Sequence, residues 1–435
     1  MKIFFSVGEP SGDLHGANLI LRLRRQQPEL KTVGYGGPRM AAAGCQLHAN
    51  LTQFAVMGLS RVLFHLLQFW ILAGRADRYF RHHRPDAVVL IDYPGFNWWI
   101  ARRAKAHRIP VFYYGTPQIW AWASWRVKKM RRLVDHVLCK LPFEPEWYRQ
   151  RGCNATFVGH PYFDQLREEL LDEKLIAELT NRPGPLVTIL PGSRTQEVKN
   201  NLKWFLKAAQ RILEEVPQAR FAIAIFKHSQ AKIAQSLIAR LDFPVDVVVG
   251  QTPELIRASH CTMACSGSVS LELLYHEKPT VILYWTTWWF YGLVKIFAPL
   301  LQFKVKYITL VNMLADEPLI ERSRYIDTDR SGAKDIPFPE YATYSDKSAQ
   351  IARHLIYWLS DKGEWQRRRT QLHQLREKIA HGGASERAAE YILSQLERNA
   401  PQPPQPHFLP SSTENSAAEQ SDVPVLVEPA KSRSQ

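Results

Sequence analysis

The chain has 435 residues, an apolar content of 46% and a formal net charge of +15. Its length is sufficient for two domains, and its excess of Lys and Arg favours anionic partners such as phosphorylated molecules, nucleic acid or an anionic membrane surface. The 5 cysteines are scattered without C-x-x-C pairs, which argues against a disulfide scaffold and against a structural zinc site.

Short apolar runs alternate with helical stretches along both halves of the chain. In the first half we expect strands over residues 3–7, 32–35, 87–91, 111–114, 136–139 and 156–158. In the second half we expect strands over residues 186–190, 222–225, 245–249, 261–264 and 280–284. This alternation predicts an α/β protein with two Rossmann-like domains, each built on a parallel sheet with helices on both faces. We expect the first domain over residues 1–170 and the second over 185–375.

A glycine-rich loop follows the first expected strand, with the sequence GEPSGDLH over residues 8–15. A strand that delivers such a loop to the start of a helix presents backbone N–H groups to a polar ligand. The side chains of Glu9, Asp13 and His15 could move protons, so we expect this loop to form part of an active site. Neither G-x-G-x-x-G nor the Walker motif occurs, which argues against a dinucleotide fingerprint and against a P-loop.

Asp92 ends the expected strand 87–91 and begins the segment DYPGFN. Ligands of open α/β sheets lie at the carboxyl ends of strands, which makes Asp92 a candidate catalytic base. An aspartate that caps a helix or shapes a turn is an equally good interpretation of the same pattern.

Two loops of the second half are typical of anion binding. Gly192, Ser193 and Arg194 follow the first strand of that half, and a second small polar loop over 266–268 follows the strand 261–264. Free N–H groups at a helix start together with one guanidinium hold a phosphate well, although a simple turn with a solvated Arg fits the first loop too. Glu272, one turn into the next helix, could accept hydrogen bonds from ribose hydroxyls. The two loops together predict a site for a nucleoside diphosphate.

Two stretches, 54–74 and 281–303, are unusually apolar, and the second is rich in Trp, Phe and Tyr. Charged residues and a proline interrupt them, so neither is a clean membrane-spanning helix. One interpretation is a core helix and an ordinary loop. The other is that these side chains dip into a bilayer surface, with Lys295, Lys304 and Lys306 beside lipid phosphates.

Asp327 and Asp329 form a D-x-D pair, a pattern that can bind a divalent metal with a nucleotide sugar. The pair lies in a polar loop away from any expected strand end, so we expect neither a metal nor another cofactor. After residue 400 the chain becomes rich in Pro, Gln, Ser and Glu, and we expect a disordered tail over 400–435.

Taken in order, several blocks of this sequence resemble the lipid A disaccharide synthases, inverting glycosyltransferases of the GT-B architecture. The resemblance covers residues 3–396. Its blocks are GEPSGDLHG (8–16), GGPRMAAAG (36–44), IDYPGFN (91–97), LPFEPEWY (141–148), FVGHP (157–161), LPGSR (190–194), SGSVSLEL (266–273) and GGASERAA (382–389).

The resemblance implies an activity and a division of labour between two sheets that face each other across a cleft. Such enzymes transfer 2,3-diacylglucosamine from its UDP derivative to the 6-hydroxyl of 2,3-diacylglucosamine 1-phosphate. The first domain, completed by a helix over about 380–398, would hold the acceptor and meet the membrane, and the second would hold the UDP-sugar. Asp92 would be the first choice for the base, with Asp13, Glu9 and His15 behind it. Substrate and nucleotide contacts would come from Ser11, Gly12, Asn97, Gly192, Ser193, Arg194, Glu197, Ser266, Gly267, Ser268, Glu272, Asn312 and Glu340.

The implied partners are the two acylated sugars and an anionic membrane surface, with no nucleic acid. The sequence leaves undecided whether the protein forms a homodimer. No secretory leader opens the sequence, so we expect a cytoplasmic protein at the inner membrane. Two alternatives stay open. One is another GT-B enzyme of UDP-sugars, such as a lipid-linked N-acetylglucosaminyltransferase or an epimerase. The other is a basic nucleic-acid-binding protein. The sequence departs from the family at Arg61, where an acidic residue is usual, and at Gly95, where a second Asp is common.

Overall fold

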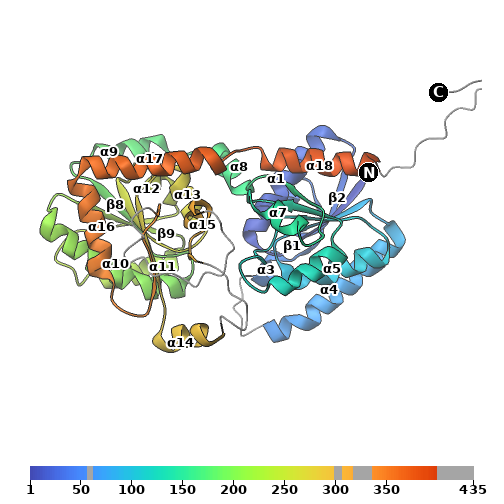
Figure 1. Cartoon of the computed structure of the whole chain (residues 1–435), viewed down its shortest axis with the longest axis horizontal. Helices are drawn as coiled ribbons and strands as arrows, with labels where there is room; N and C mark the ends of the chain where they lie inside the picture. The colour runs from blue at the N-terminus through green and yellow to red at the C-terminus, as the bar shows by residue number, and fades with distance from the viewer. Residues whose placement is uncertain (56–61, 298–305, 317–335, 399–435) are drawn as a thin grey trace, which may run out of the picture.

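The computed structural model describes residues 1–55, 62–297, 306–316 and 336–398, which form two lobes side by side (Figure 1). Each lobe is built on one sheet whose strands are all parallel. Arg61, the D-x-D pair and the expected tail lie outside the described residues.

The first lobe contains a seven-stranded sheet in the order β3-β2-β1-β4-β5-β6-β7. Its strands are β1 (Lys2–Val7), β2 (Lys31–Gly36), β3 (Gln46–Asn50), β4 (Ala87–Ile91), β5 (Val111–Tyr114), β6 (His136–Cys139) and β7 (Ala155–Phe157). Strand β1 pairs with β2 on one side and with β4 on the other. The direction in which successive strands are added therefore reverses between β1 and β4.

The second lobe contains a six-stranded sheet in the order β10-β9-β8-β11-β12-β13. Its strands are β8 (Leu186–Leu190), β9 (Arg220–Ile225), β10 (Asp246–Val249), β11 (Cys261–Cys265), β12 (Thr280–Trp285) and β13 (Glu340–Thr343). Here the order reverses between β8 and β11, so the two lobes repeat one topology.

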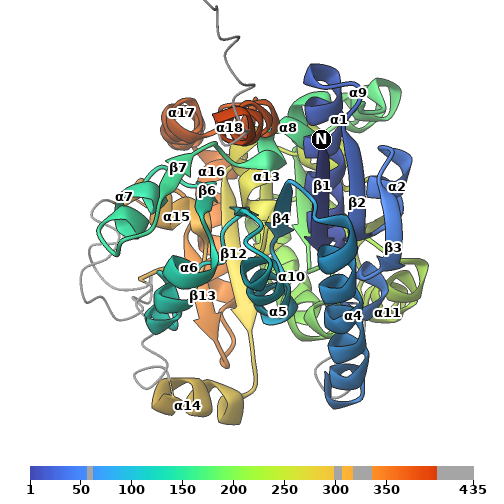
Figure 2. The same ribbon diagram turned by 90° about the vertical axis from the view of Figure 1, so that its right-hand side faces the viewer.

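Helices cover both faces of each sheet (Figure 2). The helices up to the lobe junction are α1 (Pro10–Gln26), α2 (Pro38–Ala42), α3 (Thr52–Ala55), α4 (Val62–His83), α5 (Pro94–Ala106), η2 (Ser124–Arg126), α6 (Val127–Leu133), α7 (Glu144–Arg149) and α8 (Pro161–Glu168). The later helices are α9 (Glu173–Asn181), α10 (Thr195–Glu215), α11 (His228–Ile238), α12 (Thr252–Ala258), α13 (Val269–Tyr275), α14 (Trp288–Phe297), α15 (Leu310–Ala315), α16 (Ser348–Ser360), α17 (Lys362–Ile379) and α18 (Ala384–Arg398).

The central strands are mostly apolar because both of their faces are buried. In β1, Phe4 packs in a core that includes Phe80 of α4, while its neighbour Phe5 packs in a separate core on the opposite face. That second core contains Ile20 of α1 and Ile392 of α18. Alternate side chains along one strand thus hold two layers of helices.

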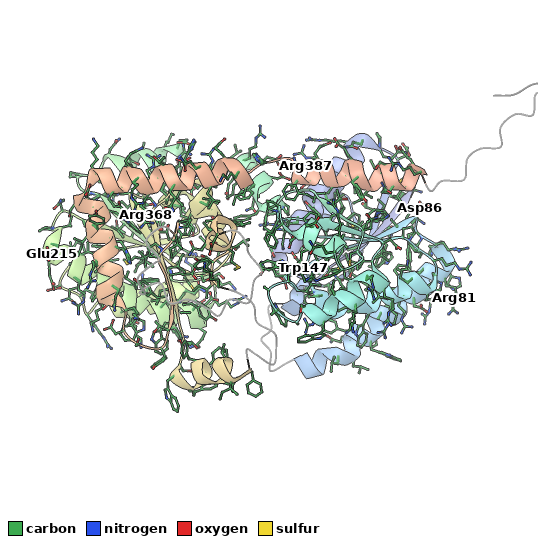
Figure 3. All side chains as sticks on the ribbon, viewed as in Figure 1. Arg81, Asp86, Trp147, Glu215, Arg368 and Arg387 are labelled. Carbon is green, nitrogen blue, oxygen red and sulfur yellow. The ribbon has the colours of Figure 1, made fainter. Side chains whose placement is uncertain are left out.

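The last helix returns to the first lobe. Helix α17 lies along the second lobe, and α18 then lies against α1 of the first (Figure 1). At the junction, the guanidinium of Arg387 donates to the carbonyl oxygens of Val158 and Gly382, each at 2.9 Å (Figure 3). The carboxylate of Asp164 accepts from the backbone N–H groups of residues 383, 384 and 385. These bonds fix the crossing.

Eleven expected strands are present to within two residues at either end. Strands β3 and β13 were not predicted from the sequence, for physical reasons. Strand β3 is a polar edge strand with no fully buried residue, and β13 begins at Glu340, a charged residue that no apolar pattern marks. Cys261 and Cys265 lie on strand β11, and all five cysteines are buried.

Candidate active site

The predicted loops lie where each sheet reverses its strand order. Glu9 follows β1 and Asp92 follows β4, the two strands at the reversal in the first lobe. Arg194 follows β8 and Ser266 follows β11, the equivalent strands of the second lobe. Parallel α/β sheets bind ligands outside the carboxyl ends of strands at this kind of switch point.

The two sets of loops approach each other across the lobe boundary. Burial raises the pKa of the Glu9 carboxyl, and the neighbouring charge of Asp92 raises it further. The charges of Lys140 and Arg194 act in the opposite direction and lower it. Arg194 belongs to the other lobe. The two lobes therefore approach closely enough here for its guanidinium to lower the pKa of Glu9.

Asp92 has a constrained backbone. Its φ is 44° and that of Tyr93 is 45°, left-handed values that cost non-glycine residues about 1–3 kcal/mol each. The carbonyl oxygen of Asp92 accepts two hydrogen bonds of 2.7 Å, from the Asn97 side-chain amide and from the Tyr113 hydroxyl. These bonds hold the turn in a conformation that it would not adopt alone.

The Asp92 carboxylate lies in a narrow space beside a cation. Its Oδ1 is 3.6 Å from Nζ of Lys140, which follows β6. A Cβ added to Gly115 would lie 3.5 Å from Oδ1, and one added to Gly12 would lie 3.8 Å from Oδ2. Gly12 therefore lines this carboxylate, while Ser11 beside it is exposed.

Two of the predicted site residues are fully engaged inside the protein. Asp13 is buried, and its carboxylate accepts from the N–H groups of Gly37, Arg39 and Met40 at 2.8 to 3.1 Å. Asn97 is 0% exposed, and its amide bonds to Ser6 and to the ends of β4. Both side chains thus hold the loops on which they lie.

Two histidines complete the first-lobe cluster. Burial lowers the pKa of His15 to about 4; the charge of Asp92 raises it by less, and that of Lys140 lowers it further. Its Nδ1 has no hydrogen-bond partner within the described residues. Burial also lowers the pKa of His160, with further lowering by Lys140 and His15. Both imidazoles are therefore neutral near pH 7.

The loop after β8 requires its glycine. Gly192 has φ of 124°, and a Cβ there would lie 2.4 Å from the Cβ of Glu197. The Glu197 carboxylate accepts from the backbone N–H of Arg194 at 3.1 Å and from its guanidinium at 2.8 Å. The Arg194 side chain is nonetheless 81% exposed, and Ser193 is exposed as well. Glu197 thus positions Arg194 and leaves most of the guanidinium accessible.

The loop after β11 contains exposed residues, and the helix that follows it carries Glu272, a carboxylate with one unpaired oxygen. Gly267 and Ser268 are exposed, and Ser266 donates to the carbonyl oxygen of Ile308 at 3.0 Å. Oε2 of Glu272 accepts from the Tyr162 hydroxyl at 2.9 Å, whereas the buried Oε1 has no partner in the described part of the chain. Burial raises the pKa of Glu272 to about 7.

Asn312 and Glu340 lie together in the interior, both 0% exposed. The Asn312 amide donates to Glu340 at 2.9 Å, and the Glu340 carboxylate also accepts from Ile308 and Thr309. Burial raises the pKa of Glu340 to about 7, although these hydrogen bonds lower it. This cluster fixes the turn at Ile308, whose carbonyl oxygen accepts from the Ser266 hydroxyl. It lies beneath the exposed loop residues and supports them.

Sequence reasoning did not single out Lys140, His160 or Tyr162. His160 lies in the FVGHP block, and Tyr162 directly follows it. Lys140 immediately precedes the LPFEPEWY block. Their proximity to these family blocks is the feature of the sequence that could have identified them. Over the residues that the structure describes, no three His, Cys, Asp or Glu side chains are grouped as metal ligands.

A sequence model of the family described as lipid-A-disaccharide synthetase matches residues 3–355. A lipid-A-disaccharide synthase from Methylobacillus flagellatus is 32% identical over 391 residues, 89% of this chain and 97% of the relative. Another from Geobacter sulfurreducens is 31% identical over 403 residues, 91% of this chain and 97% of the relative.

Solved structures of low sequence identity share the fold. The UDP-GlcNAc 2-epimerase from Neisseria meningitidis bound to UDP-GlcNAc has a TM-score of 0.56 at 13% identity, covering 92% of this chain and 100% of that one. Acinetobacter baumannii MurG has a TM-score of 0.52 at 12% identity, covering 90% and 99%. These likenesses confirm the GT-B architecture with two parallel sheets. Together with a family match over most of the sequence, they show that the chain belongs to the lipid-A-disaccharide synthase family and is a GT-B glycosyltransferase.

Proposed function

We propose that the protein transfers 2,3-diacylglucosamine from its UDP derivative to the 6-hydroxyl of 2,3-diacylglucosamine 1-phosphate, forming a β-1,6-linked disaccharide phosphate and UDP. Family membership supports formation of the lipid A disaccharide. The observation that supports the finer assignment is that Arg194, in one lobe, lies close enough to Glu9, in the other, to lower its pKa, and that Asp92 acts on the same carboxyl. Arg194 as a phosphate-binding group and a carboxylate as a proton acceptor would then lie on opposite sides of the same active site.

The second lobe would hold the donor. The exposed guanidinium of Arg194, in the loop that begins at Gly192, suits a diphosphate, which Arg can bind through two parallel hydrogen bonds. The unpaired Oε1 of Glu272 suits a ribose hydroxyl, since a buried acceptor without a donor is costly and a ligand hydroxyl would satisfy it. Exposed Gly267 and Ser268 would lie beside the nucleotide.

The first lobe would hold the acceptor and the base. Direct displacement at the anomeric carbon requires that the attacking hydroxyl lose a proton while UDP leaves from the opposite face. Asp92 would take that proton, with Lys140 as its counter-ion, and Glu9 and His15 lie in the same cluster. Arg194 would stabilise the charge that develops on the leaving diphosphate.

Five further candidates would act through their neighbours. Asp13 and Asn97 hold the loops that carry Glu9 and Asp92, Glu197 positions Arg194, and Asn312 with Glu340 supports the loop of Ser266. We therefore assign these five as positioning residues. This assignment differs from the direct contacts that the resemblance implies for them.

We further propose that the protein binds the inner membrane from the cytoplasmic side. Helices α4 and α14 reach the same side of the molecule, one from each lobe, in both views (Figures 1 and 2). Their exposed apolar side chains include Leu67 at 65%, Trp288 at 73% and Ile296 at 73%. No helix in the described ranges is long and apolar enough to cross a membrane. Lys306 pairs with Asp316, which weakens its predicted role beside lipid phosphates.

The proposal is tested with purified protein, both acylated sugar substrates and mass spectrometry of the product. We expect a disaccharide monophosphate and UDP from the wild type. Arg194→Gln should lose about 100- to 1000-fold in kcat, the usual effect of removing one donor to a developing charge. Arg211→Gln changes an exposed charge on α10 in the same lobe and serves as the matched control. Wild-type turnover by Arg194→Gln would refute the phosphate role.

A further inference from the structure

A cavity of about 360 Å³ lies in the second lobe between α12, the turn after α13 and α17. None of its lining residues belongs to the loops described above. The polar side chains that line it are Arg257, His276, Glu277, Lys278, Arg369 and Arg376.

The charges in this cavity are unbalanced. Its four cations, Arg257, Lys278, Arg369 and Arg376, face the single carboxylate of Glu277, an excess of three positive charges. Glu277 accepts from Arg376 at 2.8 Å and from Arg369 at 3.3 Å. The exposed guanidinium of Arg257 has no hydrogen-bond or ion-pair partner among the residues described.

Several of these cations are held in place. Nζ of Lys278 donates to the carbonyl oxygens of Arg257 and Ser259, each at 2.9 Å. The guanidinium of Arg376 lies 5.2 Å from the ring centre of Tyr275, and that of Arg369 lies 4.9 Å from the ring centre of Trp365. Fixed donors lose little side-chain entropy when a ligand binds.

Two titratable groups report the unbalanced charge. Burial lowers the pKa of Lys278 to about 8, and Arg369 and Arg257 lower it further, against Glu277. Burial likewise lowers the pKa of His276 to about 4, with additional lowering by Arg257, Lys278 and Arg376. At both groups the cations add to the effect of burial, and Glu277 opposes it.

The cavity lies apart from both proposed ligand surfaces. Lys278 comes just before β12 and Arg257 just before β11, so the cavity lies at the amino ends of these strands, whereas the donor loops follow the carboxyl ends of β8 and β11. Helix α17, which forms one wall, lies on the side opposite α14 in both views (Figures 1 and 2). A solute reaching it comes from solution and not from the bilayer that α14 would contact.

We propose that this cavity is a second anion site, which binds a soluble molecule through a phosphoryl or diphosphate group. Guanidinium groups bind such groups through paired hydrogen bonds, and the volume falls in the range of small-ligand pockets. An anion there would neutralise the surplus charge and would favour the protonated form of Lys278.

The test is calorimetric titration with inorganic pyrophosphate at pH 8, in the Arg194→Gln background so that binding at the donor loop is removed. We expect one binding event with uptake of protons by Lys278, seen as a dependence of the heat on the buffer. Adding Arg257→Gln should weaken binding about tenfold or more, as expected for one charge-assisted hydrogen bond. Adding Arg211→Gln should leave the affinity unchanged.

Three outcomes would overturn the proposal. One is an absence of binding in the Arg194→Gln background, which would leave the donor loop as the source of any anion binding. Another is equal affinity with and without Arg257→Gln. The third is Arg257-dependent binding to phosphatidylglycerol vesicles without binding of pyrophosphate, which would make a lipid headgroup the ligand. None of these outcomes bears on transfer activity.

Discussion

Replacing Asn97 by Ala separates a positioning role from a substrate contact. The Asn97 amide makes four hydrogen bonds: it accepts from the Ser6 hydroxyl at 2.7 Å and donates to the carbonyl oxygens of Ser6, Ile91 and Asp92. It thereby joins the ends of β1 and β4 where the sheet order reverses. The truncation leaves the buried Ser6 hydroxyl without this acceptor and removes one of the two donors to Asp92.

The expected loss of stability is about 3 kcal/mol, since each buried polar group left without a partner costs about 1–3 kcal/mol. For a lobe of this size that corresponds to a fall in Tm of roughly 6–12 °C. The left-handed turn at Asp92 then relaxes, and a shift of about 1 Å in a catalytic group costs roughly 100-fold in rate. We expect kcat to fall by about that factor while the KM values for both substrates change little.

The assays are thermal unfolding and initial rates over a matrix of both substrate concentrations. Tyr113→Phe removes the other donor to Asp92 and should lower kcat in the same way with less loss of stability. Asn181→Ala, at an exposed end of α9, is the control. An Asn97→Ala protein with wild-type Tm and kcat but a raised acceptor KM would show that Asn97 binds the substrate, contrary to this reasoning.

Gly192→Ala should raise the KM for the UDP-sugar more than tenfold, because its φ of 124° and a contact of 2.4 Å exclude a Cβ. At Gly74, on α4 in the other lobe, a Cβ meets open space, so Gly74→Ala should behave as wild type; equal kinetics of the two variants in rate assays would contradict the loop geometry. Burial raises the pKa of Glu272 from 4.5 to about 7, so folding takes up a proton and the stability due to this group declines as pH rises from about 4.5 to about 7. Glu272→Gln should remove that decline in urea unfolding midpoints, and an unchanged pH profile would be inconsistent with it. Trp288→Ser should reduce sedimentation with anionic vesicles, while Leu170→Ser, at 96% exposure, should not; equal losses in both would remove α14 as the membrane contact.

The sequence predicts most strands and the site loops because both depend on local pattern. Buried parallel strands read as apolar runs, and the loops after β1, β4, β8 and β11 combine glycine with polar residues where such runs end. The order of strands in the sheets then brings these four loops to the two switch points.

The depth of each polar side chain was not predictable in the same way. Asn97 and Glu340 occur in segments typical of ligand contacts, yet each is 0% exposed because partners distant in sequence surround it. Lys140 is equally uninformative in sequence, since its role depends on the distance of 3.6 Å to Asp92 across neighbouring loops. Local pattern identifies which residues gather at the site, and tertiary packing decides which of them face solvent.

The return of α18 to the first lobe has a consequence for synthesis. Ile392 and Leu396 fill the core that also contains Ile20 of α1, so the lobe translated first is completed by α18, the last helix among the described residues. While the ribosome is still adding the second lobe, the outer side of α1 exposes apolar surface in the nascent chain. The α1 face of the first sheet therefore closes only after α18 has been made.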